Sequence, residues 1–132
     1  MGFTEIEHTA DCSMMVWADD LPSLFGEAAR AMNQAAGARI GRGPRVRRKV
    51  SVQAADSESL LVQFLTELIY AQEQEDLGFD QFDLQMSPGK LNAKLEGSLL
   101  EALAKPIKAV TYHNLSIQRT TRGYETEIVF DV

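Results

Sequence analysis

The chain has 132 residues, the usual size of one domain, and we expect residues 1–132 to fold as a single domain. Hydrophobic residues make up 45% and charged residues 24% of the sequence, a globular composition that excludes a mainly disordered chain. The 13 basic and 19 acidic residues leave a net charge of −6, which argues against a protein that coats nucleic acid by bulk attraction.

The N-terminal part of the sequence predicts a hairpin followed by a helix. Residues 3–8 and 13–18 are predicted to be paired strands, because apolar side chains in the second stretch fall at every second position. From Leu21 onward, apolar residues recur at every third or fourth position and so share one helix face. We expect this helix to end at Gly37, since glycine readily adopts the conformation of a helix C-cap.

A basic segment, residues 39–49, follows this helix and contains no acid. Its charged residues are Arg39, Arg42, Arg45, Arg47, Arg48 and Lys49. Gly41, Gly43 and Pro44 mark a loop within it. The segment is therefore either a solvated loop that runs into an edge strand, or an electrostatic contact with an acidic partner or RNA.

A strand and a second helix come next. Alternating apolar positions predict a strand over about 47–55. Asp56 and Ser57 can cap a helix that begins there. The apolar stripe of this helix consists of Leu60, Leu61, Phe64, Leu65, Leu68 and Ile69.

The last part of the sequence predicts two hairpins. Residues 79–86 and 90–97 flank a Ser-Pro-Gly turn, and residues 107–118 and 124–131 flank a second turn. Residues 98–106 are ambiguous between a short helical turn and a loop. This order of elements predicts an α+β fold in which two helices pack on a largely antiparallel β-sheet.

The register of the last hairpin bears on where its charged residues lie. Antiparallel pairing across its turn gives partner numbers that sum to about 242, which places Asp131 beside Thr111. Strand alternation puts Lys108 on the same face as Val110. The acidic end of the last strand is therefore expected to lie over the start of the segment that begins at Lys108.

The connection after the first predicted strand holds the residues best suited to chemistry. Asp11 there is most simply a turn residue that bonds to its own backbone. A zinc site built from His8, Cys12 and His113 is an alternative, as is a small metal-dependent hydrolase that uses Asp11, Asp131 and His8. The sequence contains no serine in a glycine-rich elbow and no phosphate-binding loop, so neither a nucleophilic triad nor nucleotide binding is expected.

Four motifs together resemble the archease family from end to end. They are His8-Thr9-Ala10-Asp11, the Leu60-Leu61 pair that opens the second helix, Lys108-Ala109-Val110-Thr111-Tyr112-His113, and Phe130-Asp131-Val132. Each motif is short, but their combination in one chain of this length is specific. The resemblance implies the archease fold for the whole chain.

The resemblance also implies a function. Archeases are small protein cofactors that activate the GTP-dependent tRNA-splicing RNA ligase, which joins 3′-phosphate and 5′-hydroxyl ends, by promoting ligase guanylylation and multiple turnover. The ligase would be the partner of this chain, and RNA would be contacted only through the ligase. The family pattern implies a calcium ion held by Asp11, Asp131 and Val132, with His8 in a supporting position and Lys108 as the contact for ligase activation. Calcium takes six to eight oxygen ligands, so water or the partner would complete the shell.

Two further expectations concern location and mode of action. A single cysteine, no apolar run near the roughly 20 residues that span a bilayer, and no basic and apolar leader predict a soluble cytoplasmic protein without membrane contact. A metal-independent, chaperone-like interaction module is the remaining alternative to a ligase activator.

Overall fold

The computed structural model describes residues 1–6 and 12–132. The predictions for His8 and Asp11, and the end of the first predicted strand, lie outside these residues. The elements in chain order are β1 (Gly2–Ile6), β2 (Cys12–Ala18), α1 (Leu21–Ala36), β3 (Ala38–Ile40), β4 (Val46–Gln53), α2 (Ser57–Glu75), β5 (Leu77–Ser87), β6 (Lys90–Leu103), β7 (Ala109–Val110), β8 (Gln118–Thr120) and β9 (Gly123–Asp131).

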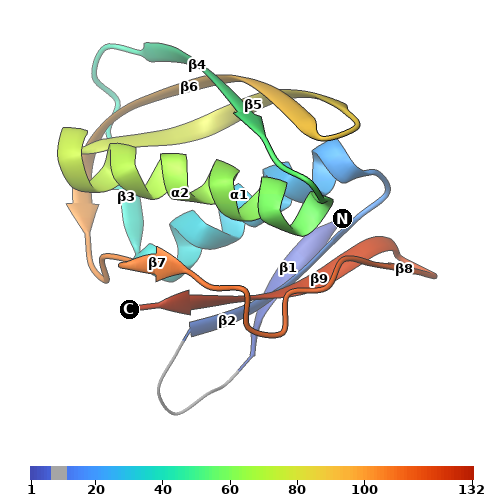
Figure 1. Ribbon diagram of the computed structural model, residues 1–132. Coiled ribbons are helices and arrows are strands. Elements are labelled where there is room, and N and C mark those ends of the chain that lie inside the picture. Colours follow the sequence, from blue (N-terminus) through green and yellow to red (C-terminus); the bar gives the residue numbers. More distant parts are fainter. Residues whose placement is uncertain (7–11) are drawn as a thin grey trace.

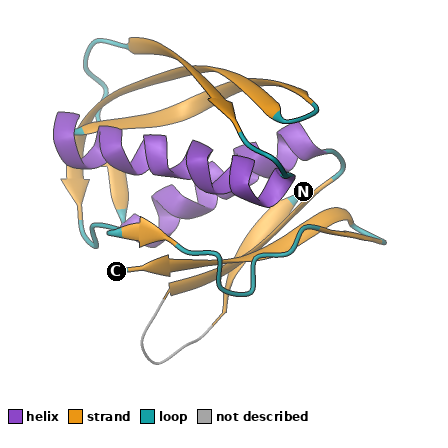
Figure 2. Cartoon of the chain, viewed as in Figure 1, coloured by secondary structure: helices purple, strands orange, loops and turns teal. Residues whose placement is uncertain are grey.

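The strands form two antiparallel sheets, and both helices lie between them (Figures 1 and 2). In the first sheet β9 pairs with β2, β7 and β8, and β1 pairs with β2. In the second, β6 pairs with β3, β4 and β5. We call them the β9 sheet and the β6 sheet. The α+β class, with two helices and antiparallel pairing in the described part of the chain, is confirmed, but the strands form two sheets where one was predicted.

Both helices begin and end where the sequence supplies caps. The Asp20 carboxylate accepts the Ser23 N–H at 2.8 Å at the start of α1, and Gly37, with a φ of 60°, ends it. At the start of α2 the Asp56 carboxylate accepts the Ser59 N–H at 2.7 Å, and this hydrogen bond lowers the pKa of Asp56.

The helices meet each other and both sheets in one core. Phe25 of α1 and Phe64 of α2 stack with ring centroids 6.1 Å apart. Val16 of β2 and Leu91 of β6 are fully buried against the helices from opposite sides. Full burial of such a side chain contributes about 2 kcal/mol to the stability of the fold. The layer of helices between the sheets therefore fixes how far apart the two sheets lie.

Buried polar side chains also join the two helices to the β6 sheet. The Asn33 Nδ2 of α1 donates to the backbone oxygen of Phe79 in β5 at 2.9 Å. The Gln72 Nε2 of α2 donates to Asn33 Oδ1, also at 2.9 Å. Because Gln72 is only 4% exposed, both helices are tied to the β6 sheet by groups that solvent cannot readily satisfy.

The prediction of a helical turn or loop over residues 98–106 is wrong for its first six residues. Residues 98–103 continue β6. Ser98 and Leu99 still pair with β5, and residues 100–103 pair with β3, a short strand that the sequence did not indicate. A close approach at Gly97 accompanies this continuation, since a Cβ there would lie 1.8 Å from the backbone oxygen of Gly78. Glycine is required at this point because no side chain fits.

The predicted register of the last hairpin is also wrong. Asp131 pairs with Ala109 and not with Thr111, whereas Gln118 pairs with Glu125. Partner numbers therefore sum to 240 at one end of the hairpin and 243 at the other. The difference arises because residues 111–117 leave the sheet and contain a turn at Asn114, whose φ is 57°.

Candidate functional site

The end of β9 brings together the segments that carry the sequence motifs. Cys12, which follows Asp11 in the chain, pairs with Phe130, the residue before Asp131. On the other side of β9, the backbone N–H of Lys108 donates to the backbone oxygen of Asp131 at 2.8 Å. Two of the predicted site residues, Lys108 and Asp131, are therefore neighbours across the strands.

Lys108 has a fixed backbone and an exposed side chain. Ile107 before it and Val110 after it are 4% and 8% exposed, so both anchor the segment in the core. The prediction that Lys108 and Val110 share one face of a strand is wrong. Lys108 precedes the short β7 and is exposed, whereas Val110 is buried. Within residues 1–6 and 12–132, no ion pair engages the Lys108 ammonium group, which leaves it available to a partner.

Asp131 and Val132 are both exposed, directly after the fully buried Phe130. The anchored phenylalanine fixes where the two following residues emerge. Asp131 offers a carboxylate, and both residues offer backbone oxygens, which are the hard ligands that calcium prefers. No cluster of three or more His, Cys, Asp or Glu side chains that could hold a metal lies among the residues the structure describes. The donors present fit calcium, but only with further ligands from outside this set.

Cys12 is poorly placed for zinc or for nucleophilic chemistry. Burial raises the pKa of its thiol, and the nearby Glu5 carboxylate, with Oε2 3.9 Å from the sulfur, raises it further. Without a metal, the nucleophilic thiolate form is therefore disfavoured. His113 lies exposed in the turn after β7, and His8 is outside the described residues, so the zinc hypothesis gains no support from Cys12.

Four of the six basic residues in the basic segment 39–49 form ion pairs with acids of the described chain. Arg45 bonds to both Asp80 and Glu96, and Arg48 bonds to Glu75. The other pairs are Arg47 with Glu96 at 3.1 Å and Arg39 with Glu101 at 4.0 Å. Residues 41–45 form a loop that runs into β4, which has only β6 as a strand partner among the described residues. Whether the segment also contacts a partner stays a prediction.

These ion pairs perturb the acids that take part in them. Hydrogen bonding from Arg47, assisted by Arg45, lowers the pKa of Glu96. Arg48 lowers the pKa of Glu75 in the same way. Sequence reasoning missed these partners because the acids lie 27 to 51 positions away in the chain. Most of the basic side chains in the segment are therefore bonded to acids within the fold.

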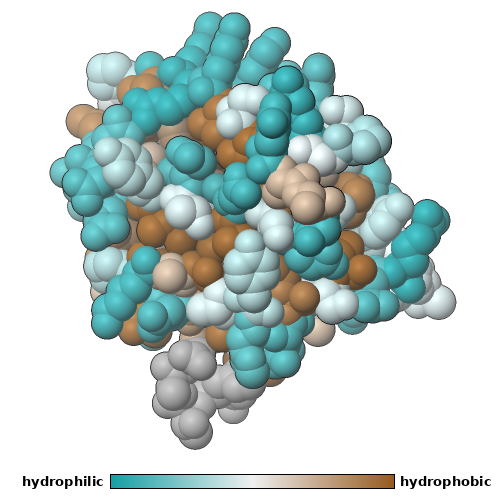
Figure 3. Space-filling model, in the orientation of Figure 1, coloured by the Kyte–Doolittle hydropathy of each residue, from teal (hydrophilic) through white to brown (hydrophobic). Residues whose placement is uncertain are grey.

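A cavity beside Lys108 was not indicated by the sequence. It has a volume of about 210 Å³ and lies between the second half of α2 and the segment that leads into β7. Its lining consists of Ile69, Gln72, Glu73, Asp76, Leu103, Pro106, Ile107 and Lys108. Figure 3 shows apolar side chains gathered on this face, between α2 and β7. The Lys108 side chain thus stands at the border of an apolar depression with two acids.

No helix in the described part of the chain is both long and apolar enough to cross a membrane.

Comparisons with known proteins agree over nearly the whole chain. Residues 3–132 match the model of the Archease protein family. Protein archease of Methanosarcina acetivorans is 31% identical over 139 residues, covering 96% of this chain and 93% of that protein. Protein archease of Archaeoglobus fulgidus is 30% identical over 139 residues and is covered completely, as is this chain.

Two solved structures share the fold. The crystal structure of a Thermotoga maritima archease, described as a possible chaperone, has a TM-score of 0.72 at 20% identity and covers 96% of this chain and 94% of that one. The solution structure of Methanobacterium thermoautotrophicum protein 1598 has a TM-score of 0.71 at 21% identity and covers 99% of both chains. At such identities the likeness bears on the fold alone.

Proposed function

Because the chain belongs to the Archease protein family, as its motifs indicated, we propose that it is a protein cofactor that activates a GTP-dependent tRNA-splicing RNA ligase. It promotes guanylylation of the ligase and repeated joining of 3′-phosphate and 5′-hydroxyl RNA ends, and it acts in the cytoplasm. The observation that carries this proposal is the meeting of the family motifs at the end of β9, where Lys108 and Asp131 are adjacent and exposed.

Lys108 is the proposed contact for activation. A lysine ammonium group is a compact point charge that can bind a phosphate or a carboxylate of the ligase. Anchoring of the backbone at Ile107 and Val110 lowers the entropy cost of presenting this charge to a partner. The apolar depression beside Lys108 would receive a side chain of the ligase.

A calcium ion is part of the same proposal, held by Asp11, Asp131 and Val132. The pairing of Cys12 with Phe130 supports this set, since each of these two residues is next to a proposed ligand in the chain. When bound, calcium supplies positive charge to a group of carboxylates and leaves coordination positions for oxygens of water or of the ligase. His8 has a supporting place and is not a ligand.

The function is tested by multiple-turnover ligation. The host's ligase is incubated with GTP and an excess of RNA bearing 3′-phosphate and 5′-hydroxyl ends, with and without this protein. We expect the protein to raise both the guanylylated fraction of the ligase and the number of turnovers per ligase. Equal product with and without the protein would contradict the proposal.

Calcium binding is tested separately by calorimetry and thermal unfolding. A bound ion stabilises the folded state by mass action, so calcium is expected to raise the melting temperature of the wild-type protein. Asp131→Asn and Asp11→Asn should each abolish this shift, whereas His8→Ala and the control Asp83→Asn on β5 should keep it. Undiminished calcium binding by the double variant of Asp11 and Asp131 would rule the site out.

Other functions make different predictions in the same experiments. Turnover of a phosphoester by the purified protein alone, abolished by Asp11→Ala, would favour a metal-dependent hydrolase. Suppression of aggregation of an unrelated protein, unaffected by calcium and by Lys108→Ala, would favour a chaperone-like module.

A further inference from the structure

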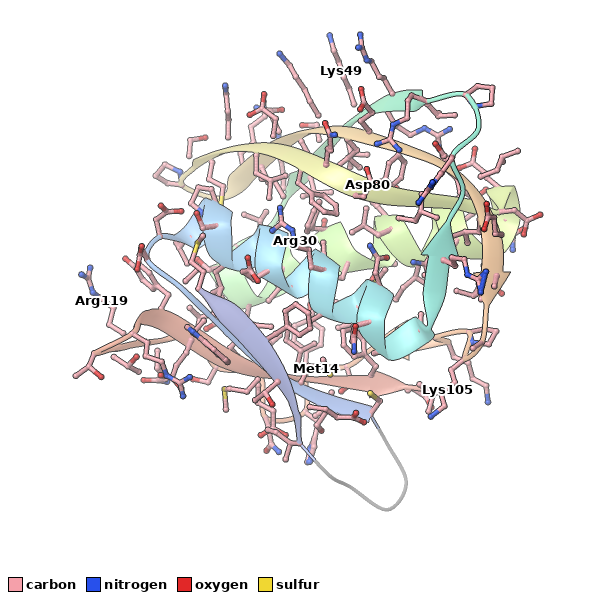
Figure 4. The ribbon with its side chains drawn as sticks, turned by 180° about the vertical axis from the view of Figure 1, so that it is seen from behind. Met14, Arg30, Lys49, Asp80, Lys105 and Arg119 are labelled. Carbon is pink, nitrogen blue, oxygen red and sulfur yellow. The ribbon has the colours of Figure 1, made fainter. Side chains whose placement is uncertain are left out.

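The face of the β6 sheet that points away from the helices is a polar surface with an unusual arrangement of cations. Burial alternates along β6: Leu91 and Ala93 are buried, whereas Asn92 and Lys94 are exposed. The side chains of this outer face are Arg47, Lys49, Ser51, Gln53, Gln81, Asp83, Gln85, Lys90, Asn92, Lys94 and Glu96. Figure 4 shows Lys49 pointing away from the molecule on this side.

Two lysines of this face lie directly opposite each other. The register pairs Lys49 of β4 with Lys94 of β6. Like charges at opposite positions destabilise an antiparallel pair. Neither lysine forms an ion pair within the described part of the chain, although Asp83 lies on the other side of Lys94 in the register. The fold therefore retains a repulsion that an anion would relieve.

Protection of a sheet edge explains only one of these lysines. Lysine on an edge strand such as β4 discourages pairing with another chain. Lys94 lies on β6, which is paired on both sides at this point, with Lys49 and with Asp83. Edge protection requires no charge there. The position of Asp83 opposite Lys94 favours a cation at this point, but Lys49 on the other side opposes it.

The surface around the two lysines is hollowed along the strands. One depression of about 490 Å³ has a mixed lining that consists of Arg47, Arg48, Lys49, Gln81, Phe82, Asp83, Lys94, Leu95 and Glu96. A second, of about 390 Å³, continues from the two lysines to Ser51 and Asn92. A run of cations is thus followed by neutral groups that can both donate and accept hydrogen bonds.

We propose that this outer face of the β6 sheet binds the sugar-phosphate backbone of single-stranded RNA. Lys49 and Lys94 would contact about two phosphates, whereas the charge of Arg47 is already paired with Glu96. The Ser51 hydroxyl donates to Asn92 Oδ1 at 3.0 Å, so the Asn92 side-chain N–H would donate to a phosphate oxygen and the Ser51 oxygen would accept from a 2′-hydroxyl. Phe82, an aromatic residue in the lining of the larger depression, packs against the core, so bases would not stack on it and binding would be independent of sequence.

An acidic peptide fits this face less well than RNA. Peptides bind sheets by adding a strand at an open edge, where backbone hydrogen bonds supply the affinity. A strand added beside β4 would reach Lys49 but would lie a full strand further from Lys94. A phosphate chain lying on the face itself reaches both lysines at once, and a width of about 10 Å across β4, β6 and β5 suits one strand better than a duplex.

The proposal is tested by fluorescence anisotropy of the whole protein with a short fluorescein-labelled oligouridylate at several salt concentrations. About two phosphate contacts predict a slope near −1.4 for log K against log salt concentration. The double variant Lys49→Gln, Lys94→Gln should reduce the slope to near zero and weaken binding about tenfold at low salt. Removal of the like-charge pair should leave its melting temperature equal to, or above, that of the wild type.

The matched control is the double variant Lys105→Gln, Arg119→Gln, which removes the same charge far from this face (Figure 4). Wild-type affinity in the control supports the proposal, as does weaker binding of oligodeoxythymidylate. No binding by the wild-type protein, equal losses in both double variants, or displacement of RNA by poly-glutamate at equal charge concentration would overturn it. The face lies across the helix layer from Lys108 and Asp131, so these outcomes leave the ligation and calcium tests unaffected.

Discussion

The two sheets cover the same pair of helices but differ in origin and in how their charges are satisfied. The β6 sheet comes from one continuous stretch, residues 38–103, and its arginines at the margin bond to acids of the same sheet or of α2. The β9 sheet joins residues 2–18 to residues 109–131. At its end, Lys108 and Asp131 form no ion pair with any residue in ranges 1–6 and 12–132.

The two sheets therefore differ in whether their charged side chains are bonded within the fold or exposed to a partner. Arg45 has bonds to Asp80, Glu96 and Ser98, so its replacement would disturb the fold before it disturbed any partner. Lys108 is exposed on a backbone that buried neighbours hold in place. The β9 sheet therefore presents groups to a partner, whereas the margin of the β6 sheet uses its groups internally.

The largest effect on stability is expected from Gly97→Ala in the β6 sheet. The added Cβ would lie 1.8 Å from the backbone oxygen of Gly78, which cannot move without separating β5 from β6. We expect a loss of at least about 3 kcal/mol in the free energy of unfolding, measured with urea. Gly43→Ala is the control, since no atom lies within 4 Å of its added Cβ. Equal stability of the two variants would contradict this close approach.

A smaller effect is expected from the bridge that ties the helices to the β6 sheet. Asn33→Ala would leave the Phe79 carbonyl oxygen and the Gln72 amide without their partner. The expected cost is about 2 kcal/mol in urea unfolding, because buried polar groups would be left unsatisfied. Gln34→Ala, at the exposed neighbouring position, should change stability by less than about 0.5 kcal/mol. A neutral Asn33→Ala would mean that the bridge does not hold the layers together.

Acid should weaken the β6 sheet through its arginine-bound glutamates. Arg47 and Arg45 lower the folded-state pKa of Glu96 below its unfolded-state pKa. Its contribution is therefore fully present above the ordinary glutamate pKa and is lost as pH falls below that value and through the lowered folded-state pKa. Glu96→Gln should be less stable than wild type at pH 7, and the difference should shrink toward pH 3. A difference that stays constant over this range would show that Glu96 acts through packing alone.

The smallest effect on stability is expected at the end of the β9 sheet. Lys108→Ala removes an exposed side chain without an ion pair and should change the free energy of unfolding by less than about 0.5 kcal/mol. Urea unfolding of this variant beside wild type measures the change. A loss above about 1 kcal/mol would mean that Lys108 supports the fold, and the contrast between the two sheets would fail.

Local signals in the sequence predicted much of the fold. The caps at Gly37 and Asp56 and the apolar stripes predicted both helices, because capping and amphipathicity depend on residues close together in the chain. The pairing of residues 100–103 with β3 was missed, since neither stretch has a strong alternating pattern and each is stabilised by the other. The register of the last hairpin failed because the departure of residues 111–117 from the sheet depends on tertiary packing.

The candidate site was predicted in part. Motif resemblance identified Lys108 and Asp131, which the structure places side by side. The partners of Arg45 and Arg48 and the depression beside Lys108 depend on segments far apart in the chain, which no local pattern brings together. Asp11 and His8 lie outside the described residues, so their roles stay predictions.

The contrast between the two sheets is tested most directly by the turnover number of the host's ligase in the presence of matched variants. Lys108→Ala and Asp131→Asn remove the exposed groups at the end of the β9 sheet, and Lys90→Ala and Asp83→Asn remove the same kinds of charge from the β6 sheet. We predict that the first pair loses most of the stimulation of multiple-turnover ligation at unchanged folding stability, while the second pair retains it. Full stimulation by Lys108→Ala and Asp131→Asn, or equal losses in all four variants, would contradict the proposal that the end of the β9 sheet carries the activity.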